Sequence, residues 1–141
     1  MKKLLSPTKL AGFLLAITVA FMFTSWSKKM KFESSGVVPD AVGSVKIKTD
    51  KNKNHTIKVR VRKLTPADQL SPPRKTYVVW MNCKNSEARN IGQLTSSSGF
   101  LSKALKGSLN TVSSSKPSSL FITVEDDGDA QFPGKIILRT R

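Results

Sequence analysis

Two neighbouring stretches of the chain, residues 43–49 (GSVKIKT) and 55–64 (HTIKVRVRKL), alternate hydrophobic and polar residues with a period of two. Valine or isoleucine stands at every second position, and lysine or arginine stands between them. Successive side chains of a β-strand point to opposite faces, so each stretch predicts a strand with one buried and one solvent-facing side. The residues between them, DKNKN, favour a tight turn because Asp and Asn hydrogen-bond nearby backbone groups. The pattern therefore predicts a β-hairpin.

A third stretch, residues 75–82 (KTYVVWMN), is hydrophobic without alternation from Tyr77 to Met81. A short apolar run of this kind is typical of a strand that is covered on both faces. It follows residues 65–74 (TPADQLSPPR), whose prolines lack the N–H donor and cannot continue a sheet ladder. We therefore predict a central strand, with Trp80 filling the core and its indole N–H hydrogen-bonded to a partner.

The rest of the chain continues the pattern of short strands and turns. Residues 101–112 (LSKALKGSLNTV) fit a helix or a strand, and the Ser-rich pieces TSSSG and SSSKPSS read as turns or loops. Several short strands separated by turn residues, with little convincing helix, predict one all-β domain built as a sandwich or barrel. The further strands that we expect are residues 89–94, 118–126 and 134–140.

The N-terminal segment has a different pattern. Lys2, Lys3 and Lys9 precede an uncharged apolar run of 17 residues, Leu10–Trp26. A basic start followed by such a run is the layout of an export signal. The run is long for the apolar part of a cleaved signal and lies at the lower limit for spanning about 30 Å of hydrocarbon. We therefore expect export, to the periplasmic or extracellular side.

Two fates of this segment stay open. Ser25 and Ser27 flank Trp26 in a small-x-small cleavage pattern, but Lys28 follows at once and is unfavourable next to a processing site. Residues 1–31 are accordingly predicted as a signal peptide or as a hydrophobic helix that anchors the chain in the inner membrane through residues 10–26. Residues 32–141 are predicted as the single β-domain.

The charge balance is strongly basic. The chain has 24 Lys and Arg against 9 Asp and Glu, a net charge of +15, and cleavage after Ser27 would remove only three of the lysines. Such a charge favours anionic partners, namely acidic glycans, anionic lipid surfaces or nucleic acid. Export makes nucleic acid the least favoured of the three.

The predicted hairpin carries the clearest concentration of cations. Its two strands would place basic side chains on one face, about 5 Å apart across the strand pair. Their mutual repulsion favours a bound anion or membrane surface, although an ordinary solvated sheet face is the alternative. The candidate anion-binding residues are Lys46, Lys48, Lys58, Arg60, Arg62 and Lys63.

Other chemistry has little support in the sequence. Cys83 is the only cysteine, so no internal disulfide can form, and the neighbouring Lys84 would favour its thiolate, which makes it a candidate reactive or partner-linking thiol. His55 is the only histidine and lies in what reads as a lysine-rich turn, so no nucleophile–base system is expected. The acidic EDDGD, residues 125–129, reads as a solvated turn rather than a calcium loop. We expect no enzyme activity, metal or cofactor.

Three stretches carry a resemblance to a known family. YVVW at 77–80, NIGQL at 90–94 and LFITVEDDGDAQFPGKIIL at 120–138 resemble strands of the C-terminal, extracytoplasmic domain of the anti-sigma-K factor family. The resemblance covers about residues 74–138. It implies an immunoglobulin-like antiparallel β-sandwich on the far side of a membrane. Family members also carry a cytoplasmic sigma-binding domain, and in this chain we expect only MKKLLSPTK on that side.

These observations lead to one main functional hypothesis and two alternatives. The main one is a non-catalytic exported envelope protein, a binding or sensing module related to anti-sigma factor extracytoplasmic domains, with a protein partner or an anionic envelope surface as its ligand. The first alternative is a module that binds anionic lipid or acidic glycan through its basic surface. The second is a thiol-active envelope protein that uses Cys83.

Overall fold

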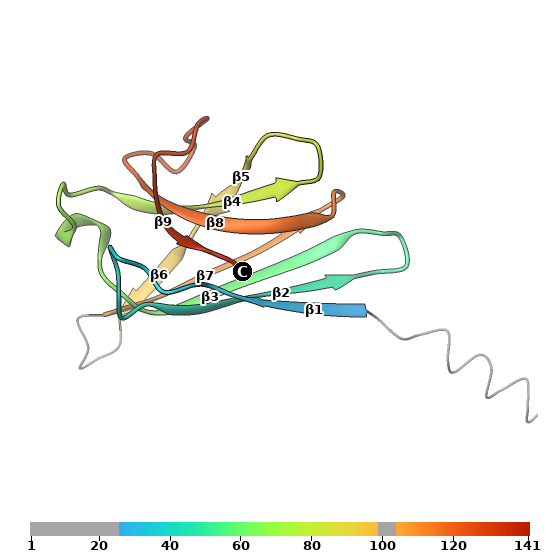
Figure 1. Cartoon of the computed structure of the whole chain (residues 1–141), viewed down its shortest axis with the longest axis horizontal. Helices are drawn as coiled ribbons and strands as arrows, with labels where there is room; N and C mark the ends of the chain where they lie inside the picture. Colours follow the sequence, from blue (N-terminus) through green and yellow to red (C-terminus); the bar gives the residue numbers. More distant parts are fainter. Residues whose placement is uncertain (1–25, 99–103) are drawn as a thin grey trace, which may run out of the picture.

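The computed structural model describes residues 26–98 and 104–141, which form two antiparallel β-sheets that pack face to face (Figure 1). One 3₁₀ helix, η2 (Ala67–Gln69), is the only helix among these residues. The all-β prediction is therefore confirmed. Within the described ranges no helix is long and apolar enough to cross a membrane.

The first sheet has five strands in the order β1-β2-β3-β7-β6. The predicted hairpin is its β2–β3 pair, and Lys46 lies directly opposite Lys58. The turn between the strands is held by Asp50, whose Oδ1 accepts hydrogen bonds from the backbone N–H groups of Asn52 (2.8 Å) and Asn54 (2.9 Å). The strands are β1 (Trp26–Lys31), β2 (Val42–Thr49), β3 (His55–Leu64), β6 (Thr95–Ser98) and β7 (Leu105–Ser113).

The second sheet has four strands in the order β5-β4-β8-β9. β4 lies between β5 and β8 and is buried continuously from Tyr77 to Met81, which confirms the prediction of a central strand. The strands are β4 (Thr76–Cys83), β5 (Arg89–Gln93), β8 (Pro117–Glu125) and β9 (Lys135–Arg139).

Alternate residues of β4 enter two different hydrophobic clusters. Tyr77, Val79 and Met81 join the main core between the sheets. Val78 and Trp80 lie on the opposite face of the second sheet, in a smaller cluster. The Trp80 ring stacks on Phe121 with centroids 6.2 Å apart, and Nε1 donates a 2.8 Å hydrogen bond to Thr123 Oγ1. Trp80 is thus buried and hydrogen-bonded as expected, but it faces away from the main core.

The described sheet begins six residues before the predicted domain boundary at residue 32. β1 covers residues 26–31, which the sequence pattern assigned to the export segment, and Met30 packs into the main core opposite Val45. β6 is likewise a strand where the Ser-rich TSSSG predicted a loop, and the ambiguous stretch 101–112 supplies β7. The rest of the predicted hydrophobic helix falls in residues 1–25, outside the described residues.

The segment after β1 joins the two sheets along one edge. Phe32 forms a bridge to Thr140, and the backbone N–H of Glu33 donates a 2.8 Å hydrogen bond to the carbonyl of Arg139. The backbone N–H of Arg141 donates to the carbonyl of Lys31 (3.2 Å). The C-terminal strand of the second sheet is therefore tied to the edge strand of the first.

Candidate anion-binding face

The outward side chains of the first sheet form cross-strand rows of cations. Met30, Val45 and Val59 are buried and stand opposite one another, so the residues that alternate with them point outward. Lys29, Lys46 and Lys58 lie directly opposite one another on β1, β2 and β3, and Asn110 of β7 completes the row.

The next rows repeat this arrangement along the strands. Lys31, Ser44, Arg60 and Ser108 form one row, in which two cations are separated by the short Ser44. On the other side of the first row, Lys48 stands between Ser27 and Thr56. We call the exposed cations on these outward positions the basic face. They are Lys29, Lys31, Lys46, Lys48, Lys58, Arg60, Arg62 and Lys106.

The positive charge of the basic face is not balanced within the sheet. None of its five strands contains an aspartate or a glutamate. The one ion pair among the described residues, Arg74 to Asp126 at 2.7 Å, lies in loops beside the second sheet. Like charges directly opposite across a strand pair are destabilising, so the basic face costs folding free energy in the absence of an anion.

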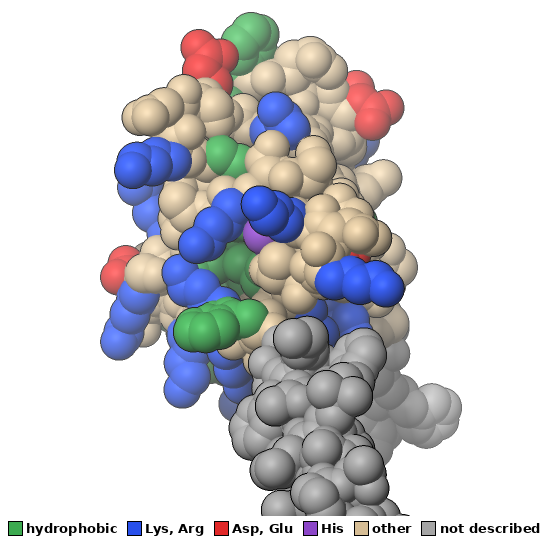
Figure 2. All heavy atoms as spheres, turned by 90° about the vertical axis from the view of Figure 1, so that its right-hand side faces the viewer, with side chains coloured by type: hydrophobic (Ala, Val, Ile, Leu, Met, Phe, Trp, Pro, Cys, Tyr) green, Lys and Arg blue, Asp and Glu red, His purple; other side chains and the backbone are tan. Residues whose placement is uncertain are grey.

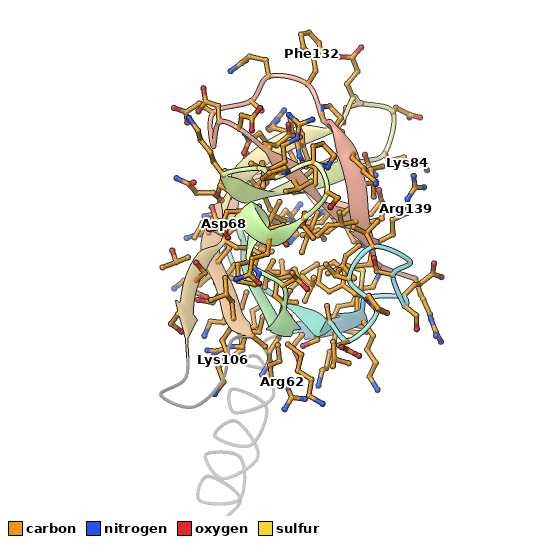
Figure 3. All side chains as sticks on the ribbon, turned by 90° about the vertical axis from the view of Figure 1, so that its left-hand side faces the viewer. Arg62, Asp68, Lys84, Lys106, Phe132 and Arg139 are labelled. Atoms are coloured by element: carbon orange, nitrogen blue, oxygen red, sulfur yellow. The ribbon has the colours of Figure 1, made fainter. Side chains whose placement is uncertain are left out.

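A groove of about 710 Å³ runs over the end of the basic face where β3 meets β7. Small residues, among them Gly43, Ser44 and Gly107, line it together with the cations. Figure 3 shows the side chains of Arg62 and Lys106 at this end of the molecule. The cations that line the groove are Lys29, Lys31, Arg60, Arg62 and Lys106.

A β-bulge concentrates charge beside this groove. Val61 pairs with Gly107 and Leu64 pairs with Leu105, so Arg62 and Lys63 together stand opposite the single residue Lys106. Lys63 adopts a positive φ of 55°. It is exposed but does not line the groove, whereas Arg62 does.

The sequence-based set is therefore largely brought together, and it is incomplete. Lys46, Lys48, Lys58, Arg60 and Arg62 share the basic face, and Lys63 stands in the bulge at its edge. Three cations of the basic face were absent from the sequence-based set. Lys29 and Lys31 were assigned to the export segment, and Lys106 lay in the stretch that fitted a helix or a strand.

Cys83 and His55 do not form a common site. Cys83 is a free, half-buried residue at the end of β4 in the second sheet, and it packs against the main core. His55 opens β3 in the first sheet rather than lying in the turn, is only 7% exposed, and its Nδ1 is 2.9 Å from Thr49 Oγ1.

The carboxylates of Glu125, Asp126 and Asp127 in the acidic segment 125–129 each interact with different partners. Glu125 Oε1 accepts hydrogen bonds from Thr123 Oγ1 (2.6 Å) and the backbone N–H of Gly134 (2.7 Å). Asp126 pairs with Arg74, and Asp127 Oδ1 accepts from the backbone N–H of Asp129 (2.9 Å). The described part of the chain has no group of three His, Cys, Asp or Glu residues that could hold a metal ion.

Comparison of the chain with family models, with curated proteins and with solved structures finds no match.

Proposed function

We propose that this protein is a non-catalytic, exported β-sandwich that binds an extended polyanion, an acidic polysaccharide, on its basic face. The observation that carries the proposal is the set of eight outward cations on a sheet whose strands contain no acidic residue. A polyanion offsets the repulsion among these cations and converts a cost of folding into binding free energy.

The dimensions of the basic face favour a polymer over a small anion. Neighbouring strands are about 4.8 Å apart, so the row from β1 to β7 extends about 14 Å across the sheet. Lys29, Lys46 and Lys58 occupy three successive positions of that row. A small anion would contact two of them at a time, whereas an extended chain of negative groups contacts cations in several rows.

The immunoglobulin-like form of the sandwich is part of this proposal. The orders β2-β3-β7-β6 and β9-β8-β4-β5 correspond to the ABED and GFCC′ sheets of immunoglobulin-type domains, with β1 as an added edge strand. The resemblance of residues 74–138 to anti-sigma-K extracytoplasmic domains supports the same fold and an exported location. The fold alone does not select a ligand, so the charged face carries the functional argument.

A binding experiment with a matched control tests the ligand. The full chain is titrated with a uronic-acid polysaccharide and with a neutral polysaccharide at several salt concentrations. The Lys58→Gln, Arg60→Gln, Arg62→Gln triple variant should bind the acidic polymer about tenfold more weakly and with a smaller salt dependence. The control triple variant Lys75→Gln, Lys84→Gln, Lys135→Gln removes the same charge from exposed positions in and next to the second sheet and should bind normally. Equal weakening in both variants, or binding that salt does not affect, would contradict the proposal.

The exported location is tested separately, by fractionating cells that produce the chain with a C-terminal tag. We expect the tag outside the cytoplasm, either released or with the membranes. A soluble cytoplasmic tag would show that the export part of the proposal is wrong.

A further inference from the structure

A second candidate site lies at the end of the sandwich where β1 begins, on the inner side of the first sheet. Trp26, Thr49, His55 and Ser113 stand opposite one another on β1, β2, β3 and β7. Trp26, Thr49 and His55 line a hollow of about 550 Å³, and Ser114, Lys116 and Pro117 line it from the β7–β8 side. We call this hollow the end pocket. Figure 2 faces this end of the molecule and shows lysine and arginine side chains around a recess that holds the histidine and hydrophobic side chains.

The end pocket is cationic. Lys28, Lys53 and Lys116 line it, and no acidic residue does. The carboxylate nearest in sequence is Asp50, and its Oδ1 already accepts two backbone hydrogen bonds within the β2–β3 turn. The pocket therefore suits an anionic group, and it is separate from the basic face because Lys28 alternates with the outward Lys29 along β1.

A buried imidazole supplies a directional polar group in the same pocket. His55 is 7% exposed and uses Nδ1 in its hydrogen bond with Thr49 Oγ1. Within the described residues no fully buried side-chain nitrogen or oxygen lacks a partner. Nε2 of His55 has no hydrogen-bond partner among the described residues, so it is not fully buried. Because His55 lines the end pocket, we infer that Nε2 is accessible from that pocket. An imidazole N–H in this position can donate to an anionic oxygen.

The rim of the pocket is amphipathic. Trp26 is 81% exposed, whereas Trp80, the other tryptophan, is 1% exposed. Indole combines a large apolar surface with one N–H donor, and tryptophan is accordingly enriched where proteins meet the headgroup layer of a bilayer. The side chain of Ile47 adds an apolar wall inside the pocket.

We propose that the end pocket binds the phosphate headgroup of an anionic lipid in a bilayer, with Trp26 lying in the headgroup layer. The apolar run that begins at Leu10 ends at Trp26, the residue that opens β1 and rims the pocket. A retained run would hold this end of the sandwich against the membrane. The positive charge of the three lysines complements the negative charge of its anionic lipids. The proposal rests on the exported, anchored form of the proposed function, and it does not depend on the polysaccharide.

The full chain in lipid nanodiscs tests this assignment. His55 is the only histidine, so its imidazole Hε1 proton gives one assignable NMR signal from inside the pocket. We expect that signal to shift in discs that contain phosphatidylglycerol and to stay unchanged in discs of phosphatidylcholine alone. The Lys53→Gln, Lys116→Gln variant should need about thirtyfold more anionic lipid for the same shift. The control Arg62→Gln, Lys106→Gln, which removes two cations of the basic face, should respond like the original chain.

Each other outcome overturns the proposal. The same shift in both kinds of disc would mean that the tether alone places the pocket at the membrane. A shift produced by inorganic phosphate without anionic lipid would assign the pocket to a soluble anion. An unchanged signal in all discs, with an intact amide spectrum, would show that the pocket stays empty. Polysaccharide binding by the same preparations reports independently on the basic face, so failure of one proposal is distinguishable from failure of the other.

Discussion

At the scale of single residues, Tyr77 shows how burial changes an ionisable group. Its hydroxyl donates a hydrogen bond to the carbonyl oxygen of Thr65 and ties the η2 connection to β4. Burial, and to a lesser degree the nearby carboxylate of Asp68, raises the pKa of Tyr77 from 10.0 to about 12. The folded state therefore keeps the phenol protonated at a pH where the unfolded chain releases its proton.

This difference predicts an alkaline loss of stability. Below pH 10 the phenol is protonated in both states and contributes no pH dependence. Between pH 10 and about 12 the unfolded state alone ionises, so the free energy of unfolding falls by about 1.4 kcal/mol per pH unit. Tyr77→Phe should lose about 1 kcal/mol at pH 7, with the hydrogen bond, and should lack this alkaline fall. Urea unfolding of both proteins from pH 7 to 12 measures the difference, in which the titration of the lysines cancels. Parallel curves would contradict the prediction.

Thr123 offers a second test at this scale. Its hydroxyl is fully buried, accepts from Trp80 Nε1 and donates to Glu125 Oε1, so both of its roles are used. Thr123→Val keeps the shape but leaves the indole N–H without a partner, and we expect it to lower the free energy of unfolding by about 2 kcal/mol. Thr123→Ser keeps the hydroxyl and should cost about 1 kcal/mol for the lost methyl group. Denaturant unfolding followed by tryptophan fluorescence measures the two costs, and equal costs for the two variants would show that the hydrogen bonds contribute little.

At the scale of elements, the contribution of β1 to the stability of the sandwich can be tested through one buried side chain. Met30→Ala should lower the free energy of unfolding by about 2 kcal/mol, because the side chain is 6% exposed and packs in the main core. Lys29→Ala, one position away and pointing outward, should change it by less than about 0.5 kcal/mol. Chemical unfolding of both variants measures the two costs. A negligible effect of Met30→Ala would mean that β1 adds nothing to the stability of the sandwich.

The sequence predicted well those elements in which the spacing of the hydrophobic residues follows the burial pattern. The β2–β3 hairpin alternates strictly, and β4 is apolar throughout. β6 was missed because TSSS has no hydrophobic alternation, and it is a strand only through its pairing with β7. β7 stayed ambiguous because Leu105 and Leu109 are four residues apart, a spacing that places them on one face of a helix and of a strand alike.

At the scale of the whole molecule, the uneven distribution of charge sets binding against stability. Lys58 lies between Lys46 and Asn110 in the central row of the basic face. Lys58→Glu replaces a repulsive cross-strand pair by an attractive one and should raise the free energy of unfolding by a few tenths to about 1 kcal/mol. The same change should weaken binding of an acidic polysaccharide. Thermal unfolding at low salt and a polysaccharide titration measure the two effects. Lys75→Glu, beside the second sheet, is the control and should neither raise the free energy of unfolding nor weaken polysaccharide binding. A loss of stability in Lys58→Glu would contradict the repulsion that we infer among the cations of the basic face.

The candidate site was predictable only as far as it is local in sequence. One hairpin supplies Lys46, Lys48, Lys58 and Arg60, and its alternation places them on one face before any tertiary structure is known. Lys29, Lys31 and Lys106 join them through pairing with strands that the pattern did not reveal. The end pocket was not predictable at all, because it combines Trp26, the β2–β3 turn and the β7–β8 connection, which meet only in the folded chain.

The pairing of β1 with β2 also determines how the domain responds to mechanical load. The two strands are antiparallel and in register over six pairs, from Trp26 opposite Thr49 to Lys31 opposite Ser44. A chain held on the N-terminal side of Trp26 and a ligand fixed on the basic face would pull along the axis of β1 in opposite directions. The hydrogen bonds between β1 and β2 would then be loaded at the same time, in shear, instead of breaking one after another. Under the two proposals above, tension between a membrane and a polymer would load these six pairs in shear.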